Sequence, residues 1–410
     1  MNILIVNTSD MYGGAAIAAS RLMDALLREG EHVKMLVRDK QANRSEVIPA
    51  GNKIQNKFNF YLERGVIFLR NRFTKKYLFD ISIANSGLSI TDLPAFREAD
   101  VIHLHWVNQG MLSLDEIGRI IASGKKIVWT MHDMWPFTGI CHHAAGCIHY
   151  ERSCGECPWL RSPSRNDLSR QLFLAKQAVY ARGEITFVAC SDWLRELAIK
   201  SPLTVGHQVV SIPNPIDTTI YRPMDKSEAR KQLNLPADKK IVLFAAVKAS
   251  DLRKGMDYLA QASHIMAQQH DDILFLIAGN KGEELGKRLF LPARSLGYVA
   301  PRDMPEVYNA ADLFVTPSLQ ENLPNTIMES MACGTPCVGF HTGGIPEMIS
   351  HGTNGYVAAY RDADDLATSM LRILYENDAA LFSLEARRKV LAEYSQEIIA
   401  QRYRQIYKSE

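Results

Sequence analysis

The sequence lacks the features that would assign it to a membrane-spanning, repeat or nucleic-acid-binding class. No apolar run reaches the ~20 residues that a membrane-spanning helix requires, and there is no short internal repeat or low-complexity segment. The net charge is only +2, so composition gives no electrostatic reason to expect nucleic acid as a partner. The first residues, Met1 to Asn7, are typical of a buried strand and lack the charged region and cleavage site of a signal peptide. We therefore expect a cytoplasmic protein, with peripheral attachment to the inner membrane face left open.

The dinucleotide fingerprint Gly-x-Gly-x-x-Gly is also absent after the first expected strand, which argues against a hydride-transfer enzyme. The chain has 410 residues, 47% of them hydrophobic, enough for two substantial cores. Short β-branched strands alternate with helical patterns in both halves, which predicts an α/β protein with two Rossmann-like parallel sheets. The two halves separate near the prolines of Ile212–Asp217. The expected strands are Ile3–Val6, His32–Val37, Val101–His105, Ile127–Met131 and Thr186–Ala189, then Ile241–Ala246, Ile273–Ala278, Leu313–Thr316, Pro336–Gly339 and Gly355–Val357.

The most informative segment runs from Pro317 to Pro336 and carries two glutamates eight residues apart. Pro324 suits the first turn of a helix, and Gly334 suits its left-handed stop. Glu321 then lies in the loop before the helix, and Glu329 about a turn and a half inside it. Backbone N–H groups at a helix start attract anions, and a nearby carboxylate can accept hydrogen bonds from sugar hydroxyls. The pattern favours a nucleotide sugar as ligand, bound by these glutamates and by Asn322, Leu323, Asn325 and Thr326.

With these residues and the following Met-Ala-Cys-Gly-Thr-Pro, the sequence resembles glycosyltransferase family 4 over nearly the whole chain. The resemblance implies the GT-B fold, with two Rossmann-like domains facing a cleft, and a retaining sugar transfer from a nucleotide diphosphate. It implies an acceptor domain of residues 1–212 completed by a crossover helix, 396–410, and a nucleotide-sugar domain of residues 213–395. Glu321 is then a sugar-hydroxyl ligand, not a nucleophile, and Glu329 the ribose ligand. Retention by front-face substitution or through a covalent intermediate is left open.

Glycines and lysines supply the expected diphosphate site. Gly13 and Gly14 separate the first strand from the first helix, where glycine lets backbone approach a ligand, and in similar enzymes this loop meets the diphosphate and the acceptor. Similar enzymes also place an Arg and a Lys on the diphosphate, six residues apart. Here Lys248 stands in place of the Arg and Lys254 matches the Lys. Lysine neutralises charge but lacks the bidentate fork, which Arg253 could supply. These charges would stabilise the leaving group without a catalytic metal.

Histidines mark the edge of the first expected sheet. The resemblance places His132, which follows the strand Ile127–Met131, against the donor sugar, with Asp133 as a candidate to orient it. His103 and His105 alternate on one strand and share a face. For His105 an acceptor-side role and a purely structural one are both open.

Four of the seven cysteines cluster within an insertion over residues 139–160 that is not part of the general family pattern. Cys154 and Cys157 form a Cys-x-x-Cys knuckle, and Cys141 and Cys147 could complete a tetrahedral site. Disulfides are unusual in a cytosolic protein, so we expect structural zinc, with an iron–sulfur cluster or free thiols as alternatives. The reserve ligands are His142, His143 and His149. The remaining cysteines, Cys190, Cys333 and Cys337, are expected to pack as small apolar residues.

A basic, aromatic-rich segment, Lys57–Phe79, could lie on an anionic membrane or pack as an ordinary helix with basic ends. Membrane contact would make a polyprenyl-diphosphate-linked glycan a plausible acceptor. We therefore predict a glycosyltransferase of surface-polysaccharide synthesis. The alternative is a non-catalytic protein that binds nucleotide sugars for scaffolding or regulation. A GT-B phosphorylase or epimerase is a third possibility, for which no characteristic motif is found.

Overall fold

The computed structural model describes residues 1–248, 251–376 and 378–409, and for Lys248 it describes the backbone only. The chain forms two compact units. The first contains Met1–Pro215 together with the residues from Ile399 onward, and the second contains Ile216–Ile398. These boundaries fall three residues beyond each of the predicted ones.

The first unit is built on a parallel sheet with the strand order β3-β2-β1-β4-β5-β6-β7. Its central strands are buried along nearly their whole length, as expected where helices cover both faces of a parallel sheet. The strands are β1 (Asn2–Ser9), β2 (His32–Asp39), β3 (Val47–Pro49), β4 (Val101–Leu104), β5 (Lys126–Met131), β6 (Thr186–Ala189) and β7 (Gln208–Ser211).

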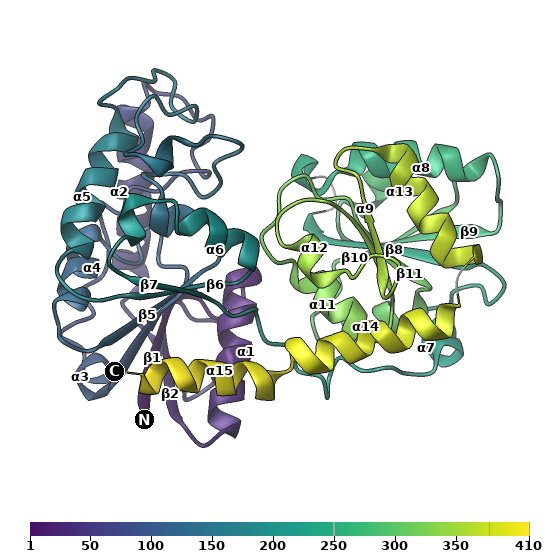
Figure 1. Ribbon diagram of the computed structural model, residues 1–410, viewed down its shortest axis with the longest axis horizontal. Coiled ribbons are helices and arrows are strands. Elements are labelled where there is room, and N and C mark those ends of the chain that lie inside the picture. The colour runs from purple at the N-terminus through teal and green to yellow at the C-terminus, as the bar shows by residue number, and fades with distance from the viewer. Residues whose placement is uncertain (249–250, 377, 410) are drawn as a thin grey trace. The chain divides into compact units, whose positions relative to one another are not determined.

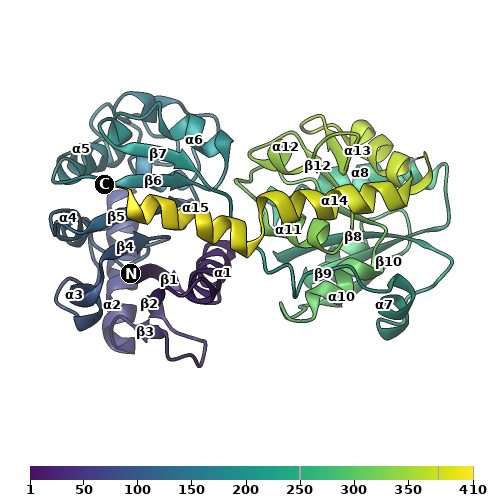
Figure 2. The same ribbon diagram turned by 60° about the horizontal axis from the view of Figure 1, so that its bottom comes forward.

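Helices α1 (Gly14–Arg28) and α15 (Gln396–Lys408) share one hydrophobic core with this sheet. A second core includes side chains of α4, α5 and α6 and of the opposite strand faces. In Figures 1 and 2 the yellow helix α15 runs alongside the strands of this unit. The remaining helices are α2 (Lys53–Arg70), α3 (Pro94–Glu98), α4 (Leu114–Ile121), α5 (Leu168–Tyr180) and α6 (Asp192–Ala198), with short 3-10 turns at η1 (Trp135–Phe137), η2 (His149–Glu151) and η3 (Pro202–Thr204).

The second unit is built on a second parallel sheet, with the strand order β10-β9-β8-β11-β12-β13. Helices α8, α9 and α13 share a hydrophobic core with it, and α11 packs against β11 and β12. The strands are β8 (Lys240–Lys248), β9 (Ile273–Asn280), β10 (Ala293–Gly297), β11 (Leu313–Thr316), β12 (Cys337–Phe340) and β13 (Gly355–Ala358). The helices are α7 (Lys226–Gln232), η4 (Leu252–Lys254), α8 (Met256–Ala267), α9 (Gly282–Gly286), α10 (Met304–Ala310), α11 (Asn325–Ala332), α12 (Ile345–Met348), α13 (Ala363–Leu371), the π-helical η5 (Arg372–Glu376) and α14 (Ala379–Glu393).

The predicted fold class is confirmed, because both units are parallel-sheet α/β folds. Every strand expected from the sequence is present, with small shifts at the ends, whereas β3, β7 and β10 were not expected. Each of these three lies at an edge of its sheet. None of the helices formed by the described residues combines the length and the apolar character needed to cross a bilayer.

Candidate active site

Lys254 and Glu321 form an ion pair at the carboxyl edge of the second sheet. Lys254 ends the turn η4 that follows β8, and Glu321 lies in the loop after β11. The ammonium Nζ lies 2.9 Å from Oε1 and 3.1 Å from Oε2 of the carboxylate. The two side chains keep 29% and 18% of their surface exposed. Both predicted charges therefore lie together where ligands bind in open α/β sheets.

Backbone contacts hold the two loops in register. Gly255 has φ +70°, and a Cβ there would come within 1.8 Å of the carbonyl oxygen of Pro317. The N–H of Leu319 donates to the carbonyl of Arg253 over 2.7 Å. Only glycine fits so close to a neighbouring backbone with a left-handed φ. The glycine after Lys254 is therefore required for packing the two charged loops together.

A second clasp comes from the loop after β12. A Cβ on Gly343 would lie 1.8 Å from the carbonyl oxygen of Glu321. The N–H of Gly344 donates to the carbonyl of Asn322 over 2.7 Å. The backbone of Glu321 is thus fixed from both sides.

Helix α11 places Glu329 as the motif predicts. The helix begins at Asn325 with Pro324 as its N-cap, so the proline lies one residue before the helix and not in its first turn. Gly334 has φ +79° and provides the predicted left-handed stop. The predicted pocket residues Asn322, Leu323, Asn325 and Thr326 surround this helix start.

Glu329 is buried and accepts a hydrogen bond from the hydroxyl of Tyr308, on α10, over 2.9 Å. Burial first, and the charge of Glu329 second, raise the pKa of Tyr308 well above its usual value. The hydroxyl therefore stays protonated and can donate to the carboxylate. The sequence motif gave no indication of this partner, because Tyr308 lies 21 residues away.

The remaining basic residues of this edge are only partly described. Arg253 makes an ion pair with Asp251 at 2.8 Å and is 58% exposed. Its guanidinium is thus already engaged with a carboxylate, which competes with the phosphate role considered for it. Lys248 ends β8, but its side chain lies outside the described part of the structure, so its role stays a prediction.

Gly13 and Gly14 lie at the carboxyl edge of the first sheet. Gly13 has φ +93° and caps α1, which begins at Gly14. Both glycines are exposed, and a Cβ on Gly13 would meet no atom within 4 Å. The Oγ of Ser9 accepts the N–H of Tyr12 over 3.1 Å and shapes the loop before them. The backbone here is open to a ligand at a helix start, as the sequence predicts.

His132 follows β5 and bonds to His105, the residue that follows β4. Its Nε2 lies 2.9 Å from Nδ1 of His105, and the two rings are stacked. Burial lowers the pKa of His132 to about 4, although Asp133 acts in the opposite direction. Burial likewise lowers the pKa of His105 well below its usual value. Both imidazoles are therefore neutral near pH 7 and can donate or accept hydrogen bonds without carrying charge.

A second hydrogen-bonded chain links His103 to helix α15. The Nε2 of His103 lies 2.7 Å from Oγ1 of Thr130, whose oxygen lies 2.8 Å from the hydroxyl of Tyr403. Tyr407 reaches the Nδ1 of His103 at 2.7 Å. Tyr403 and Tyr407 are four residues apart, so they share one face of the helix. That spacing is the signal in the sequence that indicates a shared role for the two tyrosines.

Asp133, the candidate to orient His132, has two further partners that the sequence did not indicate. Its Oδ2 accepts from the indole of Trp106 at 2.8 Å and lies 2.7 Å from Nδ1 of His142. Burial would raise the pKa of Asp133, but the attraction of His142 outweighs it and lowers that pKa to about 2. The Asp133 carboxylate therefore binds the start of the insertion through His142.

The four clustered cysteines line one small cavity together with His149. All are free thiols. Among the described residues no three His, Cys, Asp or Glu side chains are positioned to hold a metal ion as they stand. The side-chain positions therefore do not test the zinc site that the sequence predicts.

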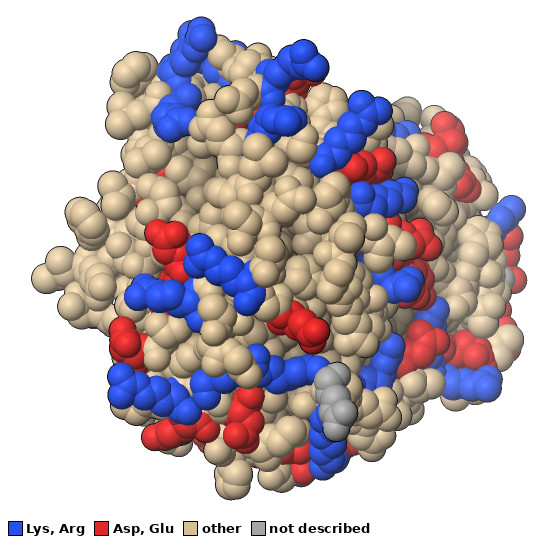
Figure 3. Space-filling model, turned by 60° about the vertical axis from the view of Figure 1, so that its left-hand side comes forward, with Lys and Arg blue, Asp and Glu red and all other residues tan. Residues whose placement is uncertain are grey.

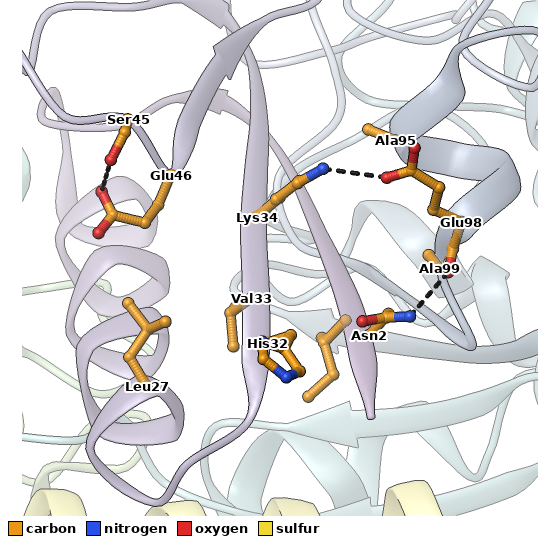
Figure 4. A pocket seen from close by; sticks show the side chains of 11 residues that line it. Asn2, Leu27, His32, Val33, Lys34, Ser45, Glu46, Ala95, Glu98 and Ala99 are labelled. Atoms are coloured by element: carbon orange, nitrogen blue, oxygen red, sulfur yellow. Dashed lines mark hydrogen bonds and ion pairs between the residues drawn. The ribbon is translucent and has the colours of Figure 1, made fainter.

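A larger hollow of about 570 Å³ lies elsewhere, at the opposite edge of the first sheet. Its lining includes Asn2 at the start of β1 and His32–Lys34 at the start of β2. Figure 4 shows Lys34 turned toward Glu98, to which it bonds at 3.0 Å. Ligands of parallel sheets bind at the carboxyl ends of strands. This hollow is therefore not our candidate site.

Two Rossmann-like units with fully parallel sheets place the protein in the GT-B class of folds. Within that class the chain belongs to glycosyltransferase family 4: the family model described as Glycosyltransferase Family 4 matches residues 12–220. A second model, described as Glycosyl transferases group 1, matches residues 238–376. The resemblance noted from the motifs is thereby confirmed.

Similar proteins carry related names. The chain is 32% identical over 186 residues to D-inositol 3-phosphate glycosyltransferase of Thermobispora bispora, covering 41% of this chain and 43% of that protein. It is 29% identical over 341 residues to an uncharacterised glycosyltransferase of Methanocaldococcus jannaschii, covering 78% of this chain and 85% of that protein. The alignments span about half the length, or less, of the first curated relatives.

The fold of this chain is also found in solved structures. Anabaena HepE, crystallised with UDP and glucose, superposes with a TM-score of 0.65 over the full length of both chains at 18% identity. At that identity the similarity establishes a shared fold only.

Proposed function

We propose that this protein is a retaining glycosyltransferase that transfers a sugar from a nucleoside diphosphate to a hydroxyl of a glycan acceptor. The observation that carries the proposal is the paired Lys254 and Glu321 at the carboxyl edge of the second sheet, next to the start of α11. An ammonium suits a diphosphate, and a carboxylate suits sugar hydroxyls. Glu329, buried and held by Tyr308, is the proposed acceptor for the ribose hydroxyls. The UDP in the HepE complex makes uridine nucleotides the first donors to test.

The reaction proposed for this site breaks the bond between the anomeric carbon and the diphosphate oxygen. The electron pair goes to the leaving diphosphate, whose growing charge Lys254 and Lys248 stabilise. The acceptor oxygen bonds to the anomeric carbon on the face that the diphosphate vacates, and its proton passes to the leaving phosphate or to water. His132 is proposed to hydrogen-bond a sugar hydroxyl. Because its imidazole is neutral, it adds no positive charge beside the ring as the ring becomes cationic.

The test is a panel of nucleotide sugars measured by calorimetry and then by turnover. We expect one donor to bind and to be hydrolysed slowly without acceptor and transferred faster with a glycan acceptor. Glu321→Ala should lose sugar selectivity, so that the nucleotide sugar and the bare nucleotide bind alike. Glu228→Ala, an exposed glutamate on α7, is the matched control. Donor binding without hydrolysis or transfer to any glycan would favour the non-catalytic alternative.

We further propose that the acceptor is lipid-linked and that α2 contacts an anionic membrane. Apolar side chains stand exposed along α2 and the loop after it: Ile54 at 82%, Phe58 at 63%, Tyr61 at 67%, Leu69 at 58%, Phe73 at 67% and Phe79 at 59%. The exposed basic side chains over 53–79 are Lys53, Lys57, Arg70, Arg72, Lys75 and Lys76.

Residues 53–79 contain one acidic side chain. The only acid of the segment, Glu63, is fully buried and bonded to the backbone N–H groups of Ile83 and Ala84. Figure 3 shows blue side chains gathered at the upper end of the face turned forward, with few red ones among them. Exposed aromatics flanked by unopposed basic residues favour the interface of an anionic bilayer. A surface-polysaccharide precursor on a polyprenyl diphosphate fits such a position.

Flotation with vesicles tests this second step. Vesicles containing phosphatidylglycerol should carry the protein, and neutral phosphatidylcholine vesicles should not. Replacing Phe58 and Phe73 by aspartate should abolish flotation, because both an apolar contact and the charge balance are lost. Replacing exposed Leu384 of α14 by aspartate is the control and should leave flotation unchanged. Equal binding to neutral and anionic vesicles would contradict the electrostatic part of the proposal.

A further inference from the structure

The Cys-rich insertion brings four thiols from separate segments to one small cavity. Cys141 lies in a β-bridge with Ile81, Cys147 follows a turn, and Cys154 and Cys157 flank a two-residue knuckle. All four line a small pocket of about 10 Å³, which is about the room that one water-sized particle needs. Thiols are weak hydrogen-bonding groups, so hydrogen bonding among them does not explain why four should gather there.

In the knuckle, Cys154 and Glu156 adopt a left-handed backbone conformation that is uncommon for residues other than glycine. Cys154 has φ 56°, Gly155 φ 96° and Glu156 φ 49°. The conformation is held by Asp167, the N-cap of α5, whose Oδ2 accepts the N–H of Cys157 over 2.8 Å. The N–H of Gly139 donates to Sγ of Cys154 over 3.2 Å. Backbone N–H donation to sulfur is the contact that supports a thiolate ligand.

A buried lysine lies beside the cysteines, and burial lowers its pKa well below the usual value. Lys176 on α5 is fully buried. Its Nζ donates to the carbonyl oxygens of Trp135 at 2.5 Å and Thr138 at 3.0 Å. No carboxylate accepts a hydrogen bond from it among the residues described here, and the groups around it that favour its charged form are the Cys154 and Cys141 sulfurs, if ionised, and the Asp133 carboxylate. A buried ammonium requires a compensating negative charge.

The geometry points to one Zn²⁺ held by Cys141, Cys147, Cys154 and Cys157, with Lys176 as the buried counter-charge. Zinc with four thiolates carries two net negative charges, and Lys176 offsets one of them. Four protein ligands close the coordination sphere, so the ion is structural and not catalytic. In the present positions the side chains do not yet form a coordination sphere. Metal entry therefore requires rotation of the thiols toward the cavity that they line.

The structure also ranks the reserve ligands. His149 lines the same cavity, although its Nδ1 bonds to the carbonyl of Gly155 at 2.8 Å. His142 instead lies between Asp133 and the hydroxyl of Ser82. A three-cysteine, one-histidine site would therefore use His149.

The direct test is the metal content of the full chain purified without a metal-affinity column. We expect about one zinc per chain, bound by four thiolates, and four thiols that resist alkylation until a chelator is added. Cys154→Ser should lower the zinc content. Cys337→Ser, a buried cysteine of β12 in the other unit, is the matched control and should leave it unchanged. If Cys154→Ser does not fold, cobalt exchanged into the wild-type protein should still give the absorption bands of a tetrahedral tetrathiolate site.

The variant Lys176→Met tests the role of the lysine independently of the four cysteine ligands. It removes the ammonium but no sulfur, so zinc should still bind, with an affinity about 10-fold or more weaker in competition with a chelator. Lys200→Met, an exposed lysine of the same unit, should behave as the wild type. The proposal is overturned by less than about a tenth of an equivalent of zinc with all four thiols reactive, by iron in place of zinc, or by disulfides among the four cysteines. Unchanged zinc affinity in Lys176→Met would remove the counter-charge role.

Discussion

The carboxyl edges of the two sheets carry opposite kinds of chemistry. In the first unit, His132 and His105 are bonded to each other and stay neutral, because burial lowers the pKa of each. In the second unit, Lys254 and Glu321 form a partly exposed ion pair. One edge offers uncharged hydrogen-bonding groups, and the other offers fixed charges.

The difference matches two separate requirements of the proposed transfer. A nearby positive charge destabilises a sugar ring that becomes cationic in the transition state. A neutral imidazole avoids this repulsion. A leaving diphosphate gains negative charge and needs cations in place before the bond breaks. In the structure Glu321 is paired with the ammonium of Lys254. In the proposed transfer the diphosphate of the donor displaces Glu321 from Lys254, and the Glu321 carboxylate then binds sugar hydroxyls.

The two edges are also held in place by different means. In the first unit, two side chains of α15 bond to the strands that precede the histidines. Tyr407 bonds to His103 in β4, and Tyr403 bonds to Thr130 in β5. In the second unit, backbone contacts at Gly255 and Gly343 fix the charged loops. Side-chain support can be removed one hydrogen bond at a time, whereas the backbone clasp does not tolerate any added Cβ.

The largest effect is expected from removing charge at the second edge. Lys254→Ala should lower kcat by about 10²–10³-fold, as for the loss of one preorganised charge-stabilising group, and change donor affinity much less. Steady-state kinetics with the identified donor measure both values. Lys239→Ala, whose lysine precedes β8 at the amino edge of the same sheet, is the control. A rise in KM at constant kcat would mean that Lys254 binds ground state and transition state equally.

The next effect concerns the proposed ribose ligand. Glu329→Ala should weaken donor binding by about 1.5–3 kcal/mol, because hydroxyl groups lose a charged acceptor. Calorimetry with the nucleoside diphosphate measures this, since the loss should not depend on the sugar. Unchanged affinity for the nucleotide would refute the ribose assignment.

The buried histidines of the first unit should make the stability of the protein depend on pH. Burial lowers the pKa of His132 to about 4 and that of His103 to about 3, below the unfolded value of about 6.5. The unfolded chain therefore takes up protons first as the pH falls. The free energy of unfolding should fall below pH ~6.5, by up to about 1.4 kcal/mol per pH unit for each histidine, and level off once the folded protein is protonated as well.

Chemical denaturation between pH 7.5 and 4.5 tests this. His103→Gln should flatten the slope, whereas His264→Gln, an exposed histidine on α8, should not. An unchanged slope in His103→Gln would mean that the buried chain does not control acid stability.

Local pattern was enough to predict much of this molecule. The strands at the centre of each sheet are mostly apolar and were all expected, because burial on both faces leaves a strong signal. The edge strands β3 and β10 were missed for the opposite reason: β3 has three residues, and β10, Ala293–Gly297, is mostly polar and only partly buried. The helix start at Asn325 and the stop at Gly334 follow from residues inside one segment.

Partners from distant elements could not be predicted in this way. Tyr308 reaches Glu329 from another helix, and Tyr403 reaches Thr130 across 273 residues of sequence. Asp133 is next to His132 in the chain, yet it bonds to Trp106 and His142. Both partners come from other segments of the chain, so the neighbours of Asp133 in the sequence did not indicate them.

The smallest effect is expected from Tyr308→Phe, which sharpens the assignment of Glu329. The substitution keeps the ring packed within the core and removes only the hydroxyl that donates to the Glu329 carboxylate over 2.9 Å. Glu329 keeps its charge, so ribose hydroxyls can still donate to it, but its position is less fixed. We expect donor affinity to fall by about 1 kcal/mol, the usual contribution of one hydrogen bond, with kcat unchanged. In the double variant with Glu329→Ala the tyrosine should add nothing further, because its effect passes through the carboxylate. Additive losses in that double-mutant cycle would show that Tyr308 contributes to donor binding independently of Glu329.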